Sequence, residues 1–217
     1  MSAPGALVGV TDWCTHPADL DVPRVGGTKN PQVDRVIALA PDLVLANEEE
    51  NRPQDFDAMR AAGLRVEVTY IRTVNQGLTE LRRVLSLLAV EPAWLAEAEA
   101  VWAEPFVGDR RRAVIPIWRR PWMAVGSDTF TGDVLARLGV DNALGDSPER
   151  YPRFDPASLP PVDLVVLPDE PYVFTADDGP EAFNAPCVLV SGRHLTWYGP
   201  SLVEARAALE AALTPQT

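Results

Sequence analysis

Residues Val22–Asn51 read VPRVGGTKNPQVDRVIALAPDLVLANEEEN and give the clearest indication of the fold class. The middle of this stretch predicts a helix over Val33–Ala40, because apolar side chains recur there at positions i, i+3, i+4 and i+7. Asn30 is the expected cap of this helix, and Pro31 suits its first turn. The apolar run Leu43–Ala46 then predicts a buried strand. A helix followed directly by a buried strand is typical of an α/β fold with a parallel sheet.

Similar elements occur on both sides of that stretch. The further strands that we expect are Leu7–Thr11, Leu64–Tyr70, Ala113–Trp118, Val162–Leu167 and Cys187–Ser191. The further helices that we expect are Asp55–Ala62, Val74–Ala89, Pro92–Ala103, Thr131–Leu138 and Ser201–Leu213. Strands and helices thus alternate before and after a purely helical middle section. The sequence therefore predicts two α/β parts joined by helix.

Length and charge narrow the classes of function. The 217 residues suffice for one large domain or for two lobes of roughly 100 residues each. The net charge of -12, from 31 acidic and 19 basic residues, repels phosphate backbones, so we expect no nucleic-acid binding. The sequence has no apolar run of about 18 residues, so we expect no membrane-spanning segment.

The cysteines and the N-terminal residues indicate in which cell compartment the chain would be found. Cys14 and Cys187 lie far apart and form no CxxC pair, which favours two unpaired thiols and leaves a single disulfide as the alternative. Residues Met1–Val10 lack a basic region followed by a long apolar core, so they do not read as a signal peptide. Taken literally, the chain would stay in the cytoplasm.

Patterns of catalytic residues are missing from the sequence. It contains no GxSxG, P-loop, GxGxxG or HExxH motif. The two histidines, His16 and His194, are not paired with a nucleophile, so an enzyme that uses them or Cys14 is only an alternative. A bare metal ion needs more clustered ligands than Cys14 and His16 supply, so we expect no metal site.

Aromatic residues gather where predicted strands end. They are Trp13, Trp118, Trp122, Trp197 and Tyr198. In open α/β sheets, ligands bind beyond the carboxyl ends of the strands. Aromatic rings there would offer flat apolar area to a broad planar ligand such as a corrin or a porphyrin. The alternative is that these side chains cap hydrophobic cores.

Charged residues lie next to these aromatics. Arg119 and His194 could pair with a carboxylate or phosphate of a ligand, or could be solvated or salt-bridged within the protein. The acidic run Glu48–Glu50 follows a predicted strand, and Glu170 follows another. These carboxylates are either exposed loop residues or a docking surface for basic residues of a partner.

Five segments together resemble the cobalamin and iron–siderophore substrate-binding proteins of ABC importers, a family of helical-backbone metal receptors. They are VGVTDWCTHP (Val8–Pro17), the stretch Val22–Asn51 quoted above, IWRRPWMAVGSDTFTGDVLARLGVDNAL (Ile117–Leu144), LPDEPYVF (Leu167–Phe174) and LTWYGPSLVEA (Leu195–Ala205). The resemblance covers nearly the whole chain, and the ordered set is far more specific than any one segment.

The resemblance implies a fold like that of class III periplasmic-binding proteins, with two α/β sandwich lobes bridged by a single backbone helix. The lobes would be residues 1–89 and 108–217, and the connecting helix would lie in residues 90–107. A metal chelate (cobalamin, haem or a ferric siderophore) would bind in the cleft between the lobes, without a covalent cofactor. The resemblance also implies a monomer in the cell envelope that serves an ABC-importer permease.

Roles can now be given to individual residues. With the cleft that the resemblance implies, the aromatic and charged residues at the strand ends give a ligand-binding set of Trp13, Trp118, Arg119, Trp122, His194, Trp197 and Tyr198. Permease docking would use Glu49, Glu50 and Glu170. A cytoplasmic corrinoid or haem sensor, or a chaperone without a permease, is the alternative function.

Two departures from the family pattern stand out. The first lobe lacks the strand and helix that family members carry before the segment matching Leu7, and the export signal is missing too. Either the start of the gene is assigned too far downstream, or the chain is a cytoplasmic relative that has lost both.

Overall fold

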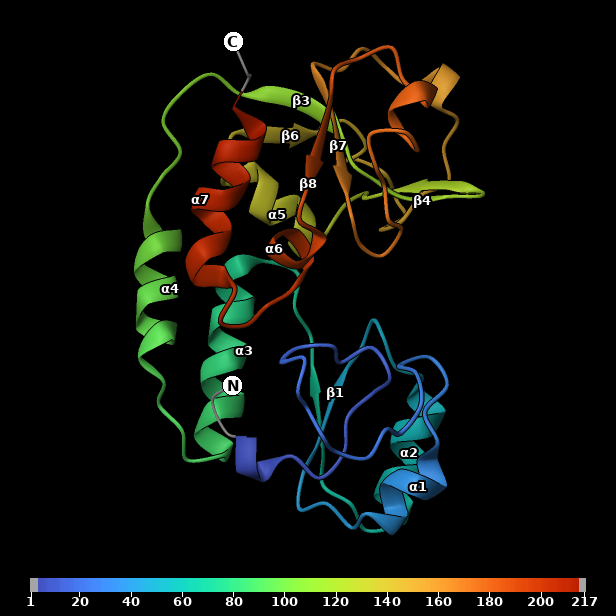
Figure 1. The fold of residues 1–217 in the computed structure, drawn as a ribbon, viewed down its shortest axis with the longest axis vertical. Coiled ribbons are helices and arrows are strands. Elements are labelled where there is room, and N and C mark those ends of the chain that lie inside the picture. The colour runs from blue at the N-terminus through green and yellow to red at the C-terminus, as the bar shows by residue number, and fades with distance from the viewer. Residues whose placement is uncertain (1–3, 215–217) are drawn as a thin grey trace. The chain divides into compact units, whose positions relative to one another are not determined.

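The computed structural model describes residues 4–214, which divide into two compact units. The first unit comprises residues up to Tyr70 together with Leu87–Val90, and the second comprises Ile71–Ser86 and the residues from Glu91 onward. Each unit has its own parallel sheet, which confirms the predicted α/β class (Figure 1).

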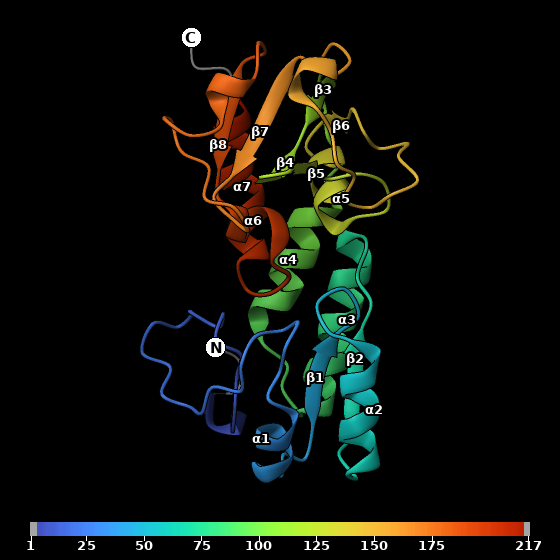
Figure 2. The ribbon, with the colours of Figure 1, turned by 90° about the vertical axis from the view of Figure 1, so that its right-hand side faces the viewer.

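The first unit is built on one pair of strands. Its elements are the 3-10 helix η1 (Pro4–Ala6), α1 (Val33–Ala38), β1 (Val44–Asn47), α2 (Pro53–Ala61) and β2 (Val66–Thr69). Strands β1 and β2 run parallel, with Val44 opposite Val66, and Figure 2 shows α2 beside them. The core contains Val36 of α1 and Phe56 and Met59 of α2. The amphipathic helices that the sequence predicts therefore cover this sheet.

Two predictions for the first unit are wrong. Residues Leu7–Thr11 contribute a single bridge, in which Val10 pairs with Arg24. The regular pairing stops there because the Asp12 N–H donates to the Gly26 carbonyl, while the Val25 carbonyl accepts from Gln32. The cap of α1 is Gln32 rather than Asn30. Before α1 begins, Pro31 forms a bridge with Gly26 and lies outside the helix, which starts at Val33 as predicted and ends at Ala38, before the predicted Ala40.

The second unit is larger. Its helices are α3 (Val74–Leu87, of which Leu87 belongs to the first unit), α4 (Ala93–Ala103), α5 (Phe130–Ala136), α6 (Gly192–Thr196) and α7 (Leu202–Leu213), with the 3-10 turns η2 (Pro156–Ser158) and η3 (Pro180–Ala182). Its strands are β3 (Arg111–Val114), β4 (Pro116–Arg119), β5 (Trp122–Ala124), β6 (Val140–Asn142), β7 (Leu164–Pro168) and β8 (Cys187–Val190). A four-stranded parallel sheet has the order β6-β3-β7-β8, and β4 and β5 form a separate antiparallel hairpin.

Helices α4 and α7 pack side by side (Figure 1). Trp102 of α4 is only 2% exposed, and its indole N–H donates to the Leu202 carbonyl at 2.8 Å. The guanidinium of Arg206 donates to two carbonyls at the end of α4, those of Val101 and Glu104. These contacts place α4 within the second unit, so the compact units do not follow the predicted ranges 1–89, 90–107 and 108–217.

The predicted strand Ala113–Trp118 is wrong in a way that matters for the site. It is two strands, because Pro116 has no N–H to continue the ladder and instead begins β4, which turns out of the main sheet. Helix α6 is absent from the sequence prediction, since five residues are too few to show a helical period. Within residues 4–214, no helix has both the length and the apolar character needed to cross a membrane.

Candidate functional site

In the first unit, Trp13 lies on a turn fixed by hydrogen bonds. The Arg24 guanidinium donates to the carbonyls of Thr11 and Cys14 at 3.0 and 2.7 Å. The indole nitrogen of Trp13 lies beside Gly27, where an added Cβ would come within 3.3 Å of it. The Trp13 side chain is nevertheless 69% exposed. A large apolar ring is thus held at the surface by a turn with a defined backbone.

The acidic turn Glu48–Glu50 follows β1, as predicted. The side chain of Asn51 accepts from the Asn47 N–H at 2.9 Å and donates to the Thr28 carbonyl at 2.8 Å. Thr28 donates to the Glu50 carboxylate at 3.0 Å, and the Lys29 ammonium donates to the Glu49 carbonyl. The loop that carries Gly27 is therefore tied to the acidic turn, and Trp13, Glu49 and Glu50 share one region of the first unit.

In the second unit, Trp118 of β4 stands edge-on to Tyr172. The ring centroids are 5.7 Å apart and the planes meet at 78°. The Tyr172 hydroxyl donates to Asp178 at 2.6 Å, and its ring contacts Phe174 at 4.7 Å. Trp118 remains 43% exposed. Tyr172 is thus held by Asp178 and Phe174, while the exposed part of the Trp118 ring is accessible from solvent.

Trp122 of β5 has a different environment. Its ring lies 5.3 Å from Phe183, 5.9 Å from Phe154 and 6.0 Å from Phe174, with which it is stacked. It packs against a buried cluster that includes Val114 and Leu167. Of the two interpretations left open by the sequence, capping of a hydrophobic core fits Trp122 better than ligand contact.

Arg119 is paired inside the protein. Its guanidinium forms ion pairs with Asp178 and Glu181 and lies 5.4 Å from the centre of the Trp122 ring. The Gly179 N–H donates to Glu181 at 2.6 Å; this hydrogen bond, together with that from Arg119, lowers the pKa of Glu181. The side chain of Arg119 is 18% exposed. Here it neutralises two carboxylates of its own chain.

Glu170 and Trp197 connect the loops after β7 and β8. The indole N–H of Trp197 donates to the Glu170 carboxylate at 2.7 Å, and the Gly192 N–H donates to Asp169 at 2.6 Å. The backbones approach so closely that a Cβ on Gly192 would lie 2.7 Å from the Glu170 nitrogen. The loops at the carboxyl ends of these two strands are therefore joined at two points.

His194 and Tyr198 flank Trp197. The His194 Nε2 lies 3.5 Å from Glu204, and the Tyr198 ring packs edge-on against Phe130 of α5 at 5.5 Å. Both side chains thus have partners within the second unit. The sequence alone does not predict these two partners, because Glu204 lies on α7 and Phe130 lies on α5.

The structure brings only part of the predicted set together. Trp118 contacts Tyr172, and Glu170 binds Trp197. Tyr172 follows Glu170 by two residues, and we call these four residues the aromatic edge. Tyr172 is not among the predicted ligand residues, although the segment LPDEPYVF contains it. Trp13, Glu49 and Glu50 belong to the first unit, and their joint use with the aromatic edge stays a prediction.

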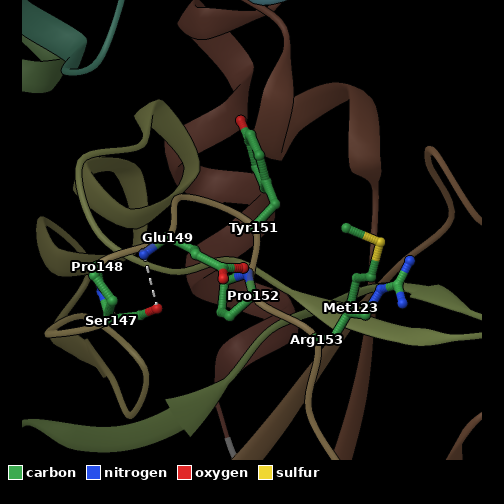
Figure 3. A pocket seen from close by; sticks show the side chains of 7 residues that line it. All are labelled: Met123, Ser147, Pro148, Glu149, Tyr151, Pro152 and Arg153. Carbon is green, nitrogen blue, oxygen red and sulfur yellow. Dashed lines mark hydrogen bonds between the residues drawn. The ribbon is translucent and has the colours of Figure 1, made fainter.

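An open pocket of about 400 Å³ lies in the second unit (Figure 3). It is lined by Met123, Ser147, Pro148, Glu149, Tyr151, Pro152 and Arg153. Its lining includes none of the predicted ligand residues. Within residues 4–214, no group of three or more His, Cys, Asp or Glu side chains could hold a metal ion, and Cys14 and Cys187 are free thiols.

Comparison of sequences finds distant relatives. No model of a known protein family matches the chain. The vitamin B12-binding protein of Salmonella typhimurium is 23% identical over 155 residues, which are 67% of this chain and 58% of that protein. The same protein of Salmonella typhi is also 23% identical over 155 residues. The matched region thus spans less than two thirds of the length of these curated relatives.

Comparison of structures finds similar folds over nearly the whole chain. The periplasmic vitamin B12-binding protein BtuF of Vibrio cholerae has a TM-score of 0.73 at 14% identity, over 97% of this chain and 91% of that one. The periplasmic haem-binding protein HutB of Vibrio cholerae has a TM-score of 0.71 at 19% identity, over 96% and 91% of the two chains. The chain therefore has the α/β fold of these substrate-binding proteins.

The comparisons agree with the family resemblance found in the sequence. The chain is a distant relative of vitamin B12-binding proteins and shares its fold with periplasmic haem- and vitamin B12-binding proteins. These relatives are named as binding proteins and not as enzymes, in line with the prediction that the chain has no catalytic activity.

Proposed function

We propose that this chain captures a metal chelate of the haem or cobalamin type and delivers it to the permease of an ABC importer in the cell envelope. The observation that carries the proposal is the aromatic edge at the carboxyl ends of β7 and β8. The relatives named above bind haem or vitamin B12 by their names, and this chain shares their fold.

Binding would rest on aromatic contact. Trp118 presents an exposed ring that is supported from behind by Tyr172, and Trp197 is oriented by Glu170. Rigid aromatic side chains give large contact areas at a low cost in conformational entropy. A corrin or a porphyrin offers the matching broad, flat surface. Trp13 is proposed as the ligand contact contributed by the first unit, because it is exposed on a fixed turn.

Permease docking is proposed for Glu49 and Glu50. Both lie on the turn after β1, whose backbone is held by Asn51 and Lys29. Carboxylates on such a turn would suit arginines of a permease, since charged rims guide association. Glu170 fits this role less well, because its carboxylate already accepts the indole N–H of Trp197.

The open side of β1 supports one further proposal about the fold. Among the described residues β1 pairs with β2 alone, and Leu45 of β1 is 48% exposed. Parallel sheets are normally covered on both faces. We propose that the first unit lacks an opening strand and helix that would otherwise pack beside β1.

Titration of tryptophan fluorescence tests the function. Cyanocobalamin, haemin and a ferric siderophore are added separately, with N-acetyltryptophanamide as the control for absorption of light by the ligands. We expect saturable quenching by cobalamin or haemin with a Kd in or below the range of about 1–10 μM, the affinity that a largely buried ligand of this size readily reaches. No saturable quenching by any of the three would overturn the proposal.

A further inference from the structure

The strand that carries Trp118 has one open edge. β5 pairs with β4 on one side and, through a bridge between Met123 and Arg153, with a further segment on its other side. Within residues 4–214, no strand pairs with the opposite side of β4. A two-stranded hairpin has little stability of its own. The position of Trp118 therefore depends on side-chain contacts along that open edge.

Asp178 takes part in two of these contacts. One oxygen of its carboxylate accepts the Tyr172 hydroxyl at 2.6 Å, and the other forms an ion pair with Arg119. The Tyr172 ring is the one that Trp118 meets edge-on, and Arg119 directly follows Trp118 in β4. A single carboxylate thus holds both the residue next to Trp118 and the ring against which Trp118 packs.

The loop that carries Asp178 has a defined conformation. The Thr175 N–H donates to the Asp178 carbonyl at 3.0 Å, which closes a tight turn. Immediately after it, the Gly179 N–H donates to Glu181 at 2.6 Å, and Glu181 forms the second ion pair of Arg119. Two carboxylates are therefore presented to the same guanidinium by a loop whose own hydrogen bonds fix their positions.

The two neighbouring arginines of the hairpin differ in their surroundings. Besides its two ion pairs, Arg119 lies over the Trp122 ring, and its side chain is mostly buried. Arg120 is exposed beside Trp118, and in the part of the chain that the structure describes its side chain makes no hydrogen bond or ion pair. Arg119 is thus committed to holding the hairpin, whereas Arg120 is not.

We infer that Asp178 is a positioning residue of the proposed chelate site and acts on Trp118. It acts through the ring of Tyr172 and through the ion pair with Arg119, which together hold the exposed indole in one orientation. The inference rests on the proposed function, in which Trp118 is a ligand contact. It also gives Arg119 a role in holding the hairpin, in place of the ligand contact that the sequence analysis expects.

The orientation of Trp118 can be tested without a ligand. Fluorine NMR spectra are recorded of the full chain labelled with fluorinated tryptophan, and the Trp118 signal is assigned by its loss in Trp118→Phe. We expect Asp178→Ala to shift this signal by more than its line width and to leave that of Trp13 in place. Asp178→Asn should shift it less, because the amide oxygen still accepts from Tyr172. An unmoved Trp118 signal in Asp178→Ala would overturn the inference.

Matched variants show whether the effect is specific to these contacts. Asp177→Asn removes a charge from the same loop but from outside the contacts with Tyr172 and Arg119, so it should leave the Trp118 signal in place. Arg119→Gln should shift the signal, and Arg120→Gln should not. Shifts of equal size in each variant and its control would contradict the inference. Thermal melts check that every variant is folded.

A double-mutant cycle with a ligand tests whether Asp178 acts through Trp118. Cyanocobalamin and haemin are titrated separately by calorimetry. Asp178→Ala should weaken the binding of whichever probe the wild type binds by about fivefold, but by less than about twofold in a Trp118→Ala background. Equal losses in both backgrounds would show that Asp178 acts independently of Trp118 and would overturn the inference, with the proposed function intact. Failure of both probes to bind the wild type would overturn the proposed function, and with it the role of Asp178 in binding.

Discussion

The indole N–H of Trp197 donates to the carboxylate of Glu170 at 2.7 Å, and this bond joins the loops that follow β7 and β8. The two residues are 27 positions apart in the sequence, yet the neighbouring parallel strands bring their loops to one edge of the sheet. The bond holds the half-buried indole of Trp197 in one orientation. The contact gives Glu170 a role in positioning Trp197, the ring that we propose faces the ligand.

The first prediction concerns this bond. Glu170→Ala should lower the free energy of unfolding by about 1–2 kcal/mol, because the Trp197 N–H loses its acceptor. Glu170→Gln should cost less, since its amide oxygen can still accept. Urea unfolding measures both changes. In a Trp197→Phe background the cost of Glu170→Ala should shrink; an unchanged cost would show that the two residues are not coupled.

The second prediction concerns the close approach of the same two loops. Gly192→Ala places a Cβ 2.7 Å from the Glu170 nitrogen and 2.6 Å from its Cβ, so the loops must move apart. We expect a loss of about 1–3 kcal/mol in unfolding free energy, the usual range for overpacking. Gly199→Ala is the control, because nothing lies within 4 Å of a Cβ there. Equal stabilities of the two variants would refute the described approach of the loops.

The third prediction separates two tryptophans of one hairpin. Trp122→Ala should destabilise the protein by about 3–5 kcal/mol, since its ring packs among Phe154, Phe174 and Phe183. Trp118→Ala should leave the melting temperature almost unchanged but weaken chelate binding at least about tenfold, because its exposed ring is the proposed contact. Thermal melts and ligand titrations of both variants decide the matter. The opposite pattern would assign the ligand surface to Trp122.

The fourth prediction concerns the thiol of Cys187. Burial raises its pKa, and the negative charge of Glu181 raises it further. The rate of alkylation follows the thiolate fraction, so in a Cys14→Ala background Cys187 should react slowly at pH 8 and accelerate only well above that pH. Glu181→Gln removes one of the two causes, so the rate profile should shift to lower pH. Iodoacetamide labelling followed by mass spectrometry gives the rates.

Asp177→Asn serves as the control for that shift. It removes an equal charge at a position outside the Cys187 environment and should leave the rate profile in place. A profile of Glu181→Gln that coincides with that of the parent would contradict the assigned effect of Glu181.

The sequence predicts most of the secondary structure because long amphipathic or apolar runs carry a clear period. Residues Val33–Ala38 and Leu164–Pro168 form the helix and the buried strand expected of them. The short apolar run Leu7–Thr11 has no such length, and hydrogen bonds of Asp12 and Arg24 decide its path instead. Elements of three to five residues, such as α6, leave too little pattern to predict.

The candidate site is predictable only in its residue types. Trp118 and Trp122 look alike in the sequence, but the register of the β4–β5 hairpin leaves one exposed and packs the other among phenylalanines. The ion pair of Arg119 with Glu181 spans 62 positions, so no local pattern shows that this arginine is already neutralised. Charge pairing across such separations depends on the tertiary structure alone.

Native mass spectrometry of the full chain with cyanocobalamin and with haemin tests the central proposal most directly. The proposal predicts a complex of one chain with one molecule of cyanocobalamin or of haemin at low micromolar concentrations. A spectrum that shows only the unliganded chain with both chelates, at concentrations up to about 100 μM, would contradict it.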